Sequence, residues 1–323
     1  MITKLYNYIK ENIKFFITLI LIFIVFTFEF PYYIDLPGGL LDVSTRVSLE
    51  EKNEISGSFN LTYVEELRAT IPSLIYSYFN KDSKIIKKEE VIATNETIEE
   101  NDYRNKLLLE ESKDNAVIVG FTKAKEDIEI SNRKVYVIYI DEQADTSLKI
   151  KDQIIKINGI KISSKEEINK IISSNDEFKI EVINDGKTYV REASKINGKI
   201  GIILCETKDI LIENEVTFNF DENESGPSGG FMMALSIYNY LEEDLTKGRK
   251  IVGTGTIDED GTVGSIGGIE FKVKTASKNK ADIFFVPIDN YEDAYKTKEE
   301  NNLDVNIVKI TNIDEAINYL KNN

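Results

Sequence analysis

Apolar and polar residues alternate along this chain in two different periods. Strand-like runs, in which β-branched and aromatic residues recur at every second position or continuously, occur near residues 45–49, 58–64, 134–140, 178–183, 200–204, 216–220, 283–287 and 305–308. Helical spacing of apolar residues occurs near residues 65–80, 98–123, 164–173, 228–241 and 272–280. The chain of 323 residues is long enough for two or three domains. These patterns predict an α/β multidomain protein.

The N-terminus carries the most apolar stretch of the sequence. Lysines precede a run from Phe15 to Phe28, and apolar character resumes after Glu29 through Tyr33. Counted from Phe15 to Tyr33, this stretch has the length of a spanning helix, which needs about 20 residues. No small-residue cleavage site follows it, which argues against a cleaved signal peptide. We expect a single-pass transmembrane signal anchor over residues 14–34, with residues 1–13 in the cytoplasm and the rest outside it at the cell membrane.

Residues 35–123 are expected to form a small α+β region without chemistry of its own. Residues 124–196 are expected to form a β-rich domain, because a hairpin around Asp185-Gly186 and a helix capped by Ser164 accompany the strands. The order of these elements, and the run from Leu148 to Gly159, resemble a PDZ domain. The pair Lys151-Asp152 departs from the usual Gly-Asp, and no glycine-rich carboxylate-binding loop is apparent.

This resemblance implies a groove between a strand and a helix, in which an extended peptide adds to the strand. The expected groove residues are Val135, Tyr136, Val137, Ile168 and Ile171. The alternative is that the domain is a spacer that shields another site.

Composition limits the chemistry that this chain can perform. A formal net charge of −16 opposes the binding of nucleic acid. The chain has no histidine and only one cysteine, Cys205, so the usual transition-metal ligands are missing. Neither a phosphate-binding loop nor a dinucleotide fingerprint is present. We therefore expect no metal, no cofactor and no nucleotide.

Two glycine-rich segments in residues 197–323 carry candidate chemistry. Ser228 lies in Gly226-Pro227-Ser228-Gly229-Gly230, where a loop becomes an apolar helix. At such a position the hydroxyl projects from a turn, glycines such as Gly226 and Gly229 let a substrate approach, and nearby backbone N–H groups can stabilise an oxyanion. Without histidine, a serine nucleophile needs another base, and lysine is the usual substitute. Lys272, which follows Gly267-Gly268, is the candidate.

These segments, with the glycine-rich run from Thr254 to Gly268, resemble the proteolytic domain of the Lon family. The resemblance implies that Ser228 is the nucleophile, that Lys272 is the general base and that the hydroxyl of Thr254 positions the lysine. Gly229 departs from the family, which usually has alanine there. The resemblance also implies self-association, with a hexameric ring as the candidate assembly, but it does not extend to an ATPase module.

The order of anchor, PDZ-like domain and Lon-type domain resembles the membrane-anchored Lon-like proteases of Gram-positive bacteria. It implies an ATP-independent serine endopeptidase that cleaves peptides or flexible, membrane-proximal proteins. The alternative is a membrane-anchored PDZ-type adaptor whose Lon-like domain is inactive.

Overall fold

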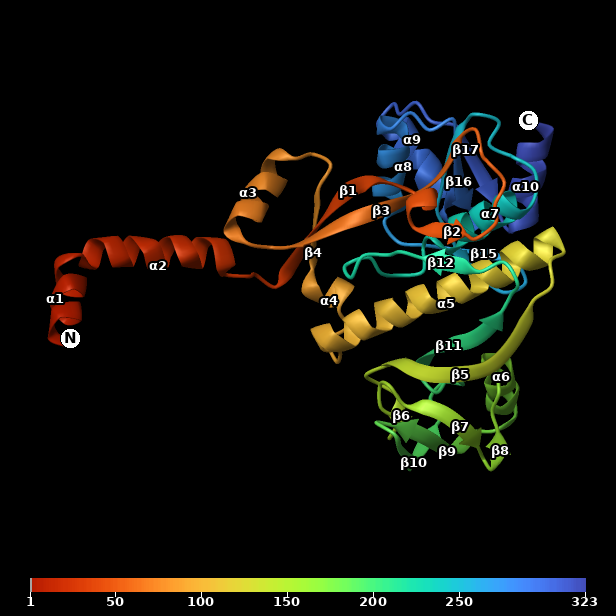
Figure 1. Ribbon diagram of the computed structural model, residues 1–323. Helices are drawn as coiled ribbons and strands as arrows, with labels where there is room; N and C mark the ends of the chain where they lie inside the picture. Colours follow the sequence, from red (N-terminus) through yellow and green to blue (C-terminus); the bar gives the residue numbers. More distant parts are fainter. Residues whose placement is uncertain (1) are drawn as a thin grey trace. The chain divides into compact units, whose positions relative to one another are not determined.

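The computed structural model describes residues 2–323, and the chain divides into two compact units. The smaller unit contains the chain up to Gly38 and residues 64–93, and the larger unit contains residues 39–63 and 94–323. Strands β1 (Tyr32–Asp42) and β3 (Ser58–Arg68) contribute residues to both units. Figure 1 follows the chain through its helices and strands.

The smaller unit contains an antiparallel pair of strands. The first residues of β1 pair with β4 (Lys84–Lys87), with Tyr32 opposite Lys87. Helix α3 (Ile71–Phe79) begins at a capping box, in which the side chain of Thr70 accepts a hydrogen bond from the backbone of Ser73. Helix α4 (Lys88–Val91) follows β4. A small core is formed by Ile34, Leu36 and Ala69, with Phe30, Leu67 and Leu74 against it.

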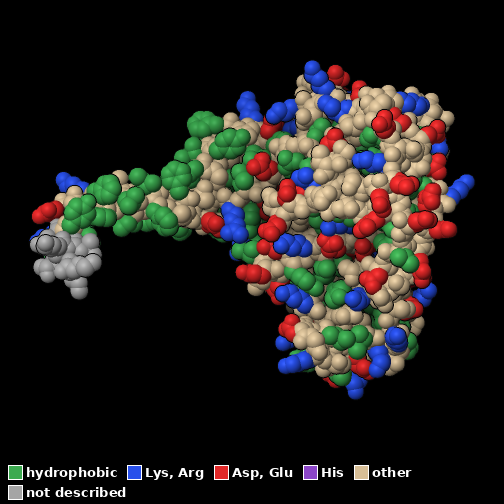
Figure 2. All heavy atoms as spheres, viewed as in Figure 1, with side chains coloured by type: hydrophobic (Ala, Val, Ile, Leu, Met, Phe, Trp, Pro, Cys, Tyr) green, Lys and Arg blue, Asp and Glu red, His purple; other side chains and the backbone are tan. Residues whose placement is uncertain are grey.

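The apolar N-terminal stretch forms a helix that is shorter than the sequence suggested. Helix α1 (Ile2–Glu11) is followed, after Asn12, by α2 (Ile13–Thr27), whose apolar side chains are mostly exposed (Figure 2). The 15 residues of α2 are about 22 Å long at a rise of about 1.5 Å per residue. The hydrocarbon core of a bilayer is about 30 Å thick. Within residues 2–323, no helix has the length and apolar character needed to cross a membrane.

The predicted transmembrane anchor over residues 14–34 is therefore wrong. The helix stops at Thr27 because Phe28 is already extended, and Tyr32 and Tyr33, which were counted in the span, lie in β1. The transmembrane helix in the predicted fold class and the predicted single-pass location in the cell membrane are corrected with it. The fold class is mixed α/β.

The larger unit contains a parallel sheet with helices on both faces. Its strands lie in the order β17 (Ile307–Ile310), β16 (Ile283–Pro287), β13 (Lys250–Gly253) and β3, with β1 beside β3. Ile251 and Phe285 face a core shared with α7 (Gly230–Leu241) and α10 (Ile313–Asn322). Val252 and Phe284 face a core shared with α8 (Ile269–Lys278) and α9 (Tyr291–Glu300). Neighbouring residues of a strand point to opposite faces, so both faces of the sheet are covered, and the central strand β16 is apolar and buried throughout.

A β-rich sheet forms the second part of the larger unit. Its order is β11 (Ile202–Leu211), β5 (Glu129–Ile140), β7 (Gln153–Ile157), β9 (Glu177–Asn184), β10 (Lys187–Ser194) and β6 (Asp145–Thr146), and β8 (Ile160–Lys161) pairs with β7. Helix α6 (Lys165–Ser174) contributes the fully buried Ile168 to the core of this sheet. Two short ribbons complete the unit. One pairs β2 (Val47–Leu49) with β12 (Val216–Phe218), and the other pairs β14 (Thr256–Ile257) with β15 (Val263–Gly264).

Helix α5 (Ile98–Ala124) packs against both parts of the larger unit. Its capping box joins Thr97 to Glu100, and its bounds confirm the helix predicted at residues 98–123. The helix packs on α7 on one side and on β11 on another (Figure 1). Gly120 allows the close approach to α7, because a Cβ atom there would lie 2.5 Å from Cγ2 of Ile237. The sequence placed this helix in a region without a role in the site, whereas it lies in the same unit as residues 197–323.

Candidate active site

Ser228 lies in a tight turn immediately before helix α7. Gly226 has a φ of +89°, a left-handed conformation that glycine adopts without strain. The N–H of Gly230 donates to the carbonyl of Pro227 at 3.1 Å and closes the turn. Helix α7 is buried along almost its whole length. The half-buried Ser228 is therefore presented from a turn that is fixed to the core.

Lys272 lies in the first turn of helix α8 and points its amine at Ser228. Gly268 caps this helix with a φ of +66°, and α8 begins at Ile269. The side chain of Lys272 is only 3% exposed, and Ile269 and Val273 beside it belong to the hydrophobic core. Its Nζ donates to Oγ of Ser228 at 3.0 Å. A nucleophile and a base are thus within the distance at which a proton can pass between them.

Thr254 joins these two side chains. It is fully buried in the segment between β13 and β14. Its Oγ1 accepts a hydrogen bond from Nζ of Lys272 at 2.9 Å and donates to the carbonyl of Ser228 at 3.2 Å. The N–H of Gly255 donates to the same carbonyl at 2.9 Å. The fold therefore brings together Ser228, Thr254 and Lys272, which come from three different elements.

Burial sets the charge state of Lys272. Removal of the ammonium group from water lowers the pKa of Lys272 from 10.5 to about 8. A depressed pKa makes the neutral amine accessible near neutral pH, which a lysine needs in order to accept a proton. Of the candidate residues, Lys272 thus has the electrostatic property of a general base.

The backbone N–H groups around the turn differ in their availability. The N–H of Gly226 donates to the carbonyl of Asn105 at 3.0 Å, so it is engaged within the fold. Across the residues that the structure describes, the N–H groups of Ser228 and Gly229 donate to no acceptor. They lie at the N-terminal end of α7, where the helix dipole favours negative charge. Gly226 therefore serves the turn, whereas the N–H groups of Ser228 and Gly229 can meet an oxyanion.

Several residues that hold the turn gave no signal in the sequence. Arg46 binds both carboxylate oxygens of Glu224, at 2.8 and 2.9 Å, and Asp221 at 3.0 Å. From helix α5, Oγ of Ser112 donates to the carbonyl of Pro227 at 3.2 Å. These partners are more than 100 residues apart in the sequence, and periodicity does not reveal such pairings.

The residues of the predicted peptide groove lie in a paired strand and in a helix that packs on its sheet. Val135 and Val137 are buried, and β5 is paired on both sides, with β11 along residues 129–140 and with β7 at residues 135 and 136. Ile168 is fully buried, and Tyr136 and Ile171 are partly buried. Strand addition needs a free edge. At Val135 and Tyr136, strand β5 is already paired with β11 on one side and with β7 on the other, so the backbone has no free edge for a peptide at these two residues.

Comparison with known families supports one enzyme class. A family model described as the Lon protease (S16) C-terminal proteolytic domain matches residues 148–322, which is more than half of the chain. A search among curated proteins found no match. The matched range includes Ser228, Thr254 and Lys272, but neither Arg46 nor helix α5. The match indicates a serine peptidase, a hydrolase whose substrates are peptides or proteins.

Proposed function

Because the chain belongs to the Lon protease (S16) C-terminal proteolytic domain family, we propose that it is an ATP-independent serine endopeptidase with a Ser228–Lys272 dyad. The observation that carries the proposal is the buried amine of Lys272, 3.0 Å from Oγ of Ser228 and with its pKa lowered to about 8. An exposed lysine would stay protonated near neutral pH and could not act as a base.

The reaction starts from neutral Lys272. Its Nζ accepts the hydroxyl proton of Ser228 while Oγ attacks the carbonyl carbon of the peptide bond. The N–H groups of Ser228 and Gly229 are the candidate donors to the oxyanion that forms. Thr254 holds the amine in place through the hydrogen bond from Nζ to its Oγ1.

The tetrahedral intermediate then loses its amine. The ammonium group of Lys272 gives its proton to the leaving nitrogen, and the C–N bond breaks to leave an ester on Ser228. Water then attacks the carbonyl carbon of this ester, and neutral Lys272 accepts a proton from the attacking water. The bond to Oγ breaks, the carboxylic product leaves, and Lys272 returns the proton to Oγ of Ser228. Both half-reactions use one base, so the dyad needs no metal and no cofactor.

ATP independence is proposed from the sequence, which has no phosphate-binding loop of the G-x-x-x-x-G-K-[ST] type. Without a nucleotide-driven unfolding step, the substrates are peptides and flexible segments of proteins. We further propose that residues 124–196 form a PDZ-like body, that residues 197–323 form the proteolytic domain, and that the chain self-associates, for which sedimentation velocity gives the number of subunits. The adaptor alternative has less support, because β5 is already paired with both β11 and β7 at the predicted groove residues Val135 and Tyr136.

The test is cleavage of an unstructured protein by the purified full chain, without ATP or metal, followed by mass spectrometry. The variants are Ser228→Ala and Lys272→Met, and Lys278→Met is the matched control, because Lys278 is an exposed lysine on the same helix. We expect cleavage by the parent and by the control, and none by the two dyad variants. Undiminished cleavage by Ser228→Ala would refute the dyad.

A further inference from the structure

Helix α5 contacts the segment that carries Ser228 and the segment that begins at Thr254, although it lies outside the range that the family model matches. At the nucleophile turn, the carbonyl of Asn105 accepts from Gly226, and Ser112 donates to Pro227. One helical turn after Ser112, the side chain of Asn115 reaches the segment that follows Thr254. A single rigid element therefore spans the two halves of the site.

Asn115 uses both ends of its side-chain amide. Its Nδ2 donates to the carbonyl of Ile257 at 2.9 Å, and its Oδ1 accepts from Nζ of Lys208 at 2.6 Å. Asn115 is only 7% exposed, and Lys208, from strand β11, is 8% exposed. Buried polar groups of this kind are costly when unpaired, so the amide has one preferred orientation.

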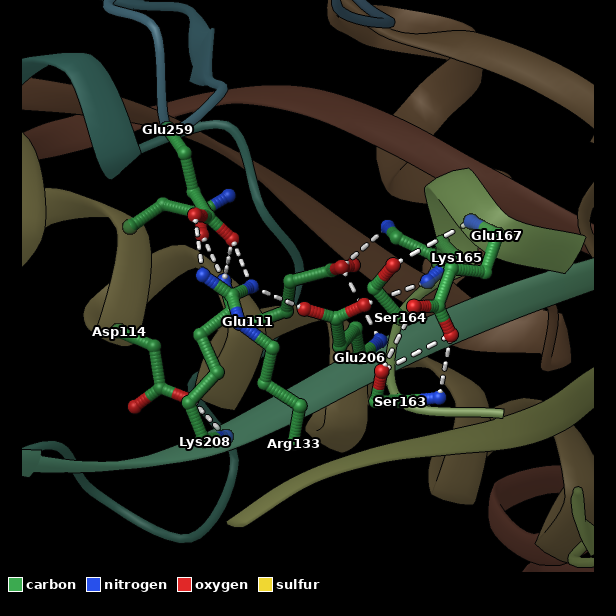
Figure 3. A network of polar contacts seen from close by, with 11 residues as sticks. Glu111, Asp114, Arg133, Ser163, Ser164, Lys165, Glu167, Glu206, Lys208 and Glu259 are labelled. Atoms are coloured by element: carbon green, nitrogen blue, oxygen red, sulfur yellow. Dashed lines mark hydrogen bonds and ion pairs between the residues drawn. The ribbon is translucent and has the colours of Figure 1, made fainter. Parts of the chain in front are cut away.

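Lys208 continues the contact to the same segment. Its Nζ lies 2.6 Å from Oε1 of Glu259, and Arg133 of β5 binds both carboxylate oxygens of Glu259, at 2.7 and 2.9 Å. Figure 3 shows the carboxylate of Glu259 facing the guanidinium group of Arg133. The hydrogen bond from Arg133 holds the pKa of Glu259 near 2, well below its ordinary value, so the carboxylate stays charged. Arg133 also binds Glu206 of β11.

The 254–259 segment is therefore held at both ends. At its far end, Asn115 fixes the carbonyl of Ile257, and two cations fix the carboxylate of Glu259. At its near end, Thr254 accepts from Lys272, and Gly255 donates to Ser228. Only four residues lie between Thr254 and Glu259, so a shift at the far end moves the near end.

We propose that Asn115 is a positioning residue of the active site, which orders the 254–259 segment and thereby keeps Lys272 and Ser228 in reach of each other. The proposal rests on the proposed function, because it assigns a role in the same reaction. Asn115 touches neither of the two dyad side chains and acts through the backbone of Ile257 and through Lys208.

The experiment compares Asn115→Ala with the parent in the full chain, using the pH dependence of kcat/KM for a fluorogenic peptide. Nζ of Lys272 faces the hydroxyls of Ser228 and Thr254, and burial lowers its pKa. A loosened segment admits water, so we expect the midpoint of the pH profile to move upward by at least about half a unit. A displacement of about 1 Å costs about 100-fold in rate, so kcat should fall between 10- and 100-fold while KM changes little. A loss of folded protein alone would lower the amplitude without moving the midpoint.

Asn101→Ala is the matched control, because Asn101 is a buried asparagine of the same helix whose amide contacts Glu96 and Asn105 instead. We expect it to retain the midpoint of the parent. A kcat and a midpoint of Asn115→Ala equal to those of the parent would overturn the proposal, and so would equal losses in both asparagine variants. If Asn115→Ala does not fold, Glu259→Gln tests the proposal instead. This substitution weakens the ion pairs that hold the far end of the 254–259 segment, so it should also move the midpoint of the pH profile upward.

Amide hydrogen exchange separates this inference from the proposed function. Faster exchange of residues 254–259 in Asn115→Ala than in Asn101→Ala supports the positioning role even if the parent cleaves nothing, and equal exchange overturns it. A parent that cleaves no peptide refutes the proposed function, whatever the exchange of this segment.

Discussion

The buried amine of Lys272 should destabilise the folded protein measurably, and the substitution Lys272→Met tests this. Methionine has a similar length and no charge, so it fills the same space without being desolvated as a cation. The pKa of Lys272 falls from 10.5 to about 8 in the folded protein. A difference of about 2.5 units corresponds to roughly 3 kcal/mol at neutral pH.

The direction in which stability changes with pH follows from proton binding to the folded and unfolded chains. The unfolded chain holds the lysine proton up to about pH 10.5, whereas the folded chain releases it near pH 8. Between these values the unfolded state binds more protons, so the stability of the parent rises with pH. From about pH 7.5 to about pH 9.5, the parent should gain about 2 kcal/mol relative to Lys272→Met. Other titrating groups are common to both proteins and cancel in the comparison.

Near neutral pH, the free energies of unfolding of Lys272→Met and the parent should differ by less than the roughly 3 kcal/mol that desolvation alone would give. The substitution also removes the hydrogen bonds to Ser228 and Thr254, each of which contributes about 1 kcal/mol. Their loss offsets most of the gain of roughly 3 kcal/mol. We therefore expect the variant to be about 1 kcal/mol more stable than the parent near pH 7.5 and less stable near pH 9.5.

The assay is urea unfolding followed by circular dichroism at several pH values, with stabilities from linear extrapolation. Lys278→Met serves as the control, because it makes the same substitution at an exposed position of the same helix. A stability difference between parent and Lys272→Met that stays constant over this pH range would refute the reasoning.

Three further changes test other parts of the site. Gly230→Ala should destabilise the chain by about 1–3 kcal/mol in urea unfolding, because its Cβ would lie 2.4 Å from Oγ of Ser112. Gly229→Ala should have a smaller effect, because its Cβ meets only Leu61, at 3.0 Å. Equal losses of stability in the two variants would contradict the close approach of α5. Thr254→Val removes the hydroxyl that accepts from Lys272, so kcat should fall about tenfold with the fold intact by circular dichroism, and an unchanged kcat would exclude a positioning role. Arg46→Lys replaces a two-oxygen contact with Glu224 by a single one, so amide exchange of residues 219–226 should become faster, and unchanged exchange would show that Arg46 does not order this loop.

The sequence was informative where the signal is local. The glycines around Ser228 and before Lys272 marked the turns, since only residues without a side chain adopt the left-handed φ of Gly226 and Gly268 readily. The apolar residues flanking Lys272 indicated burial, and the missing histidine pointed to lysine as the base. Apolar spacing likewise indicated helix α5 with its bounds nearly correct.

The sequence misled where a local pattern has several three-dimensional outcomes. Apolar content alone did not show that α2 stops at Thr27 and that the next apolar residues enter a strand. The strand pattern around Val135 did not show that β11 pairs with β5, because pairing partners are chosen by tertiary contacts.

By itself, the sequence determined which groups are present for the chemistry: a serine in a turn, a lysine among apolar residues, and no imidazole. Only the tertiary structure decided their distances, and it did so through residues remote in the chain. Helix α5 brings Asn115 to the carbonyl of Ile257, across more than 140 positions. Such contacts depend on how whole elements pack, and periodicity along one element carries no information about the neighbour that it will meet.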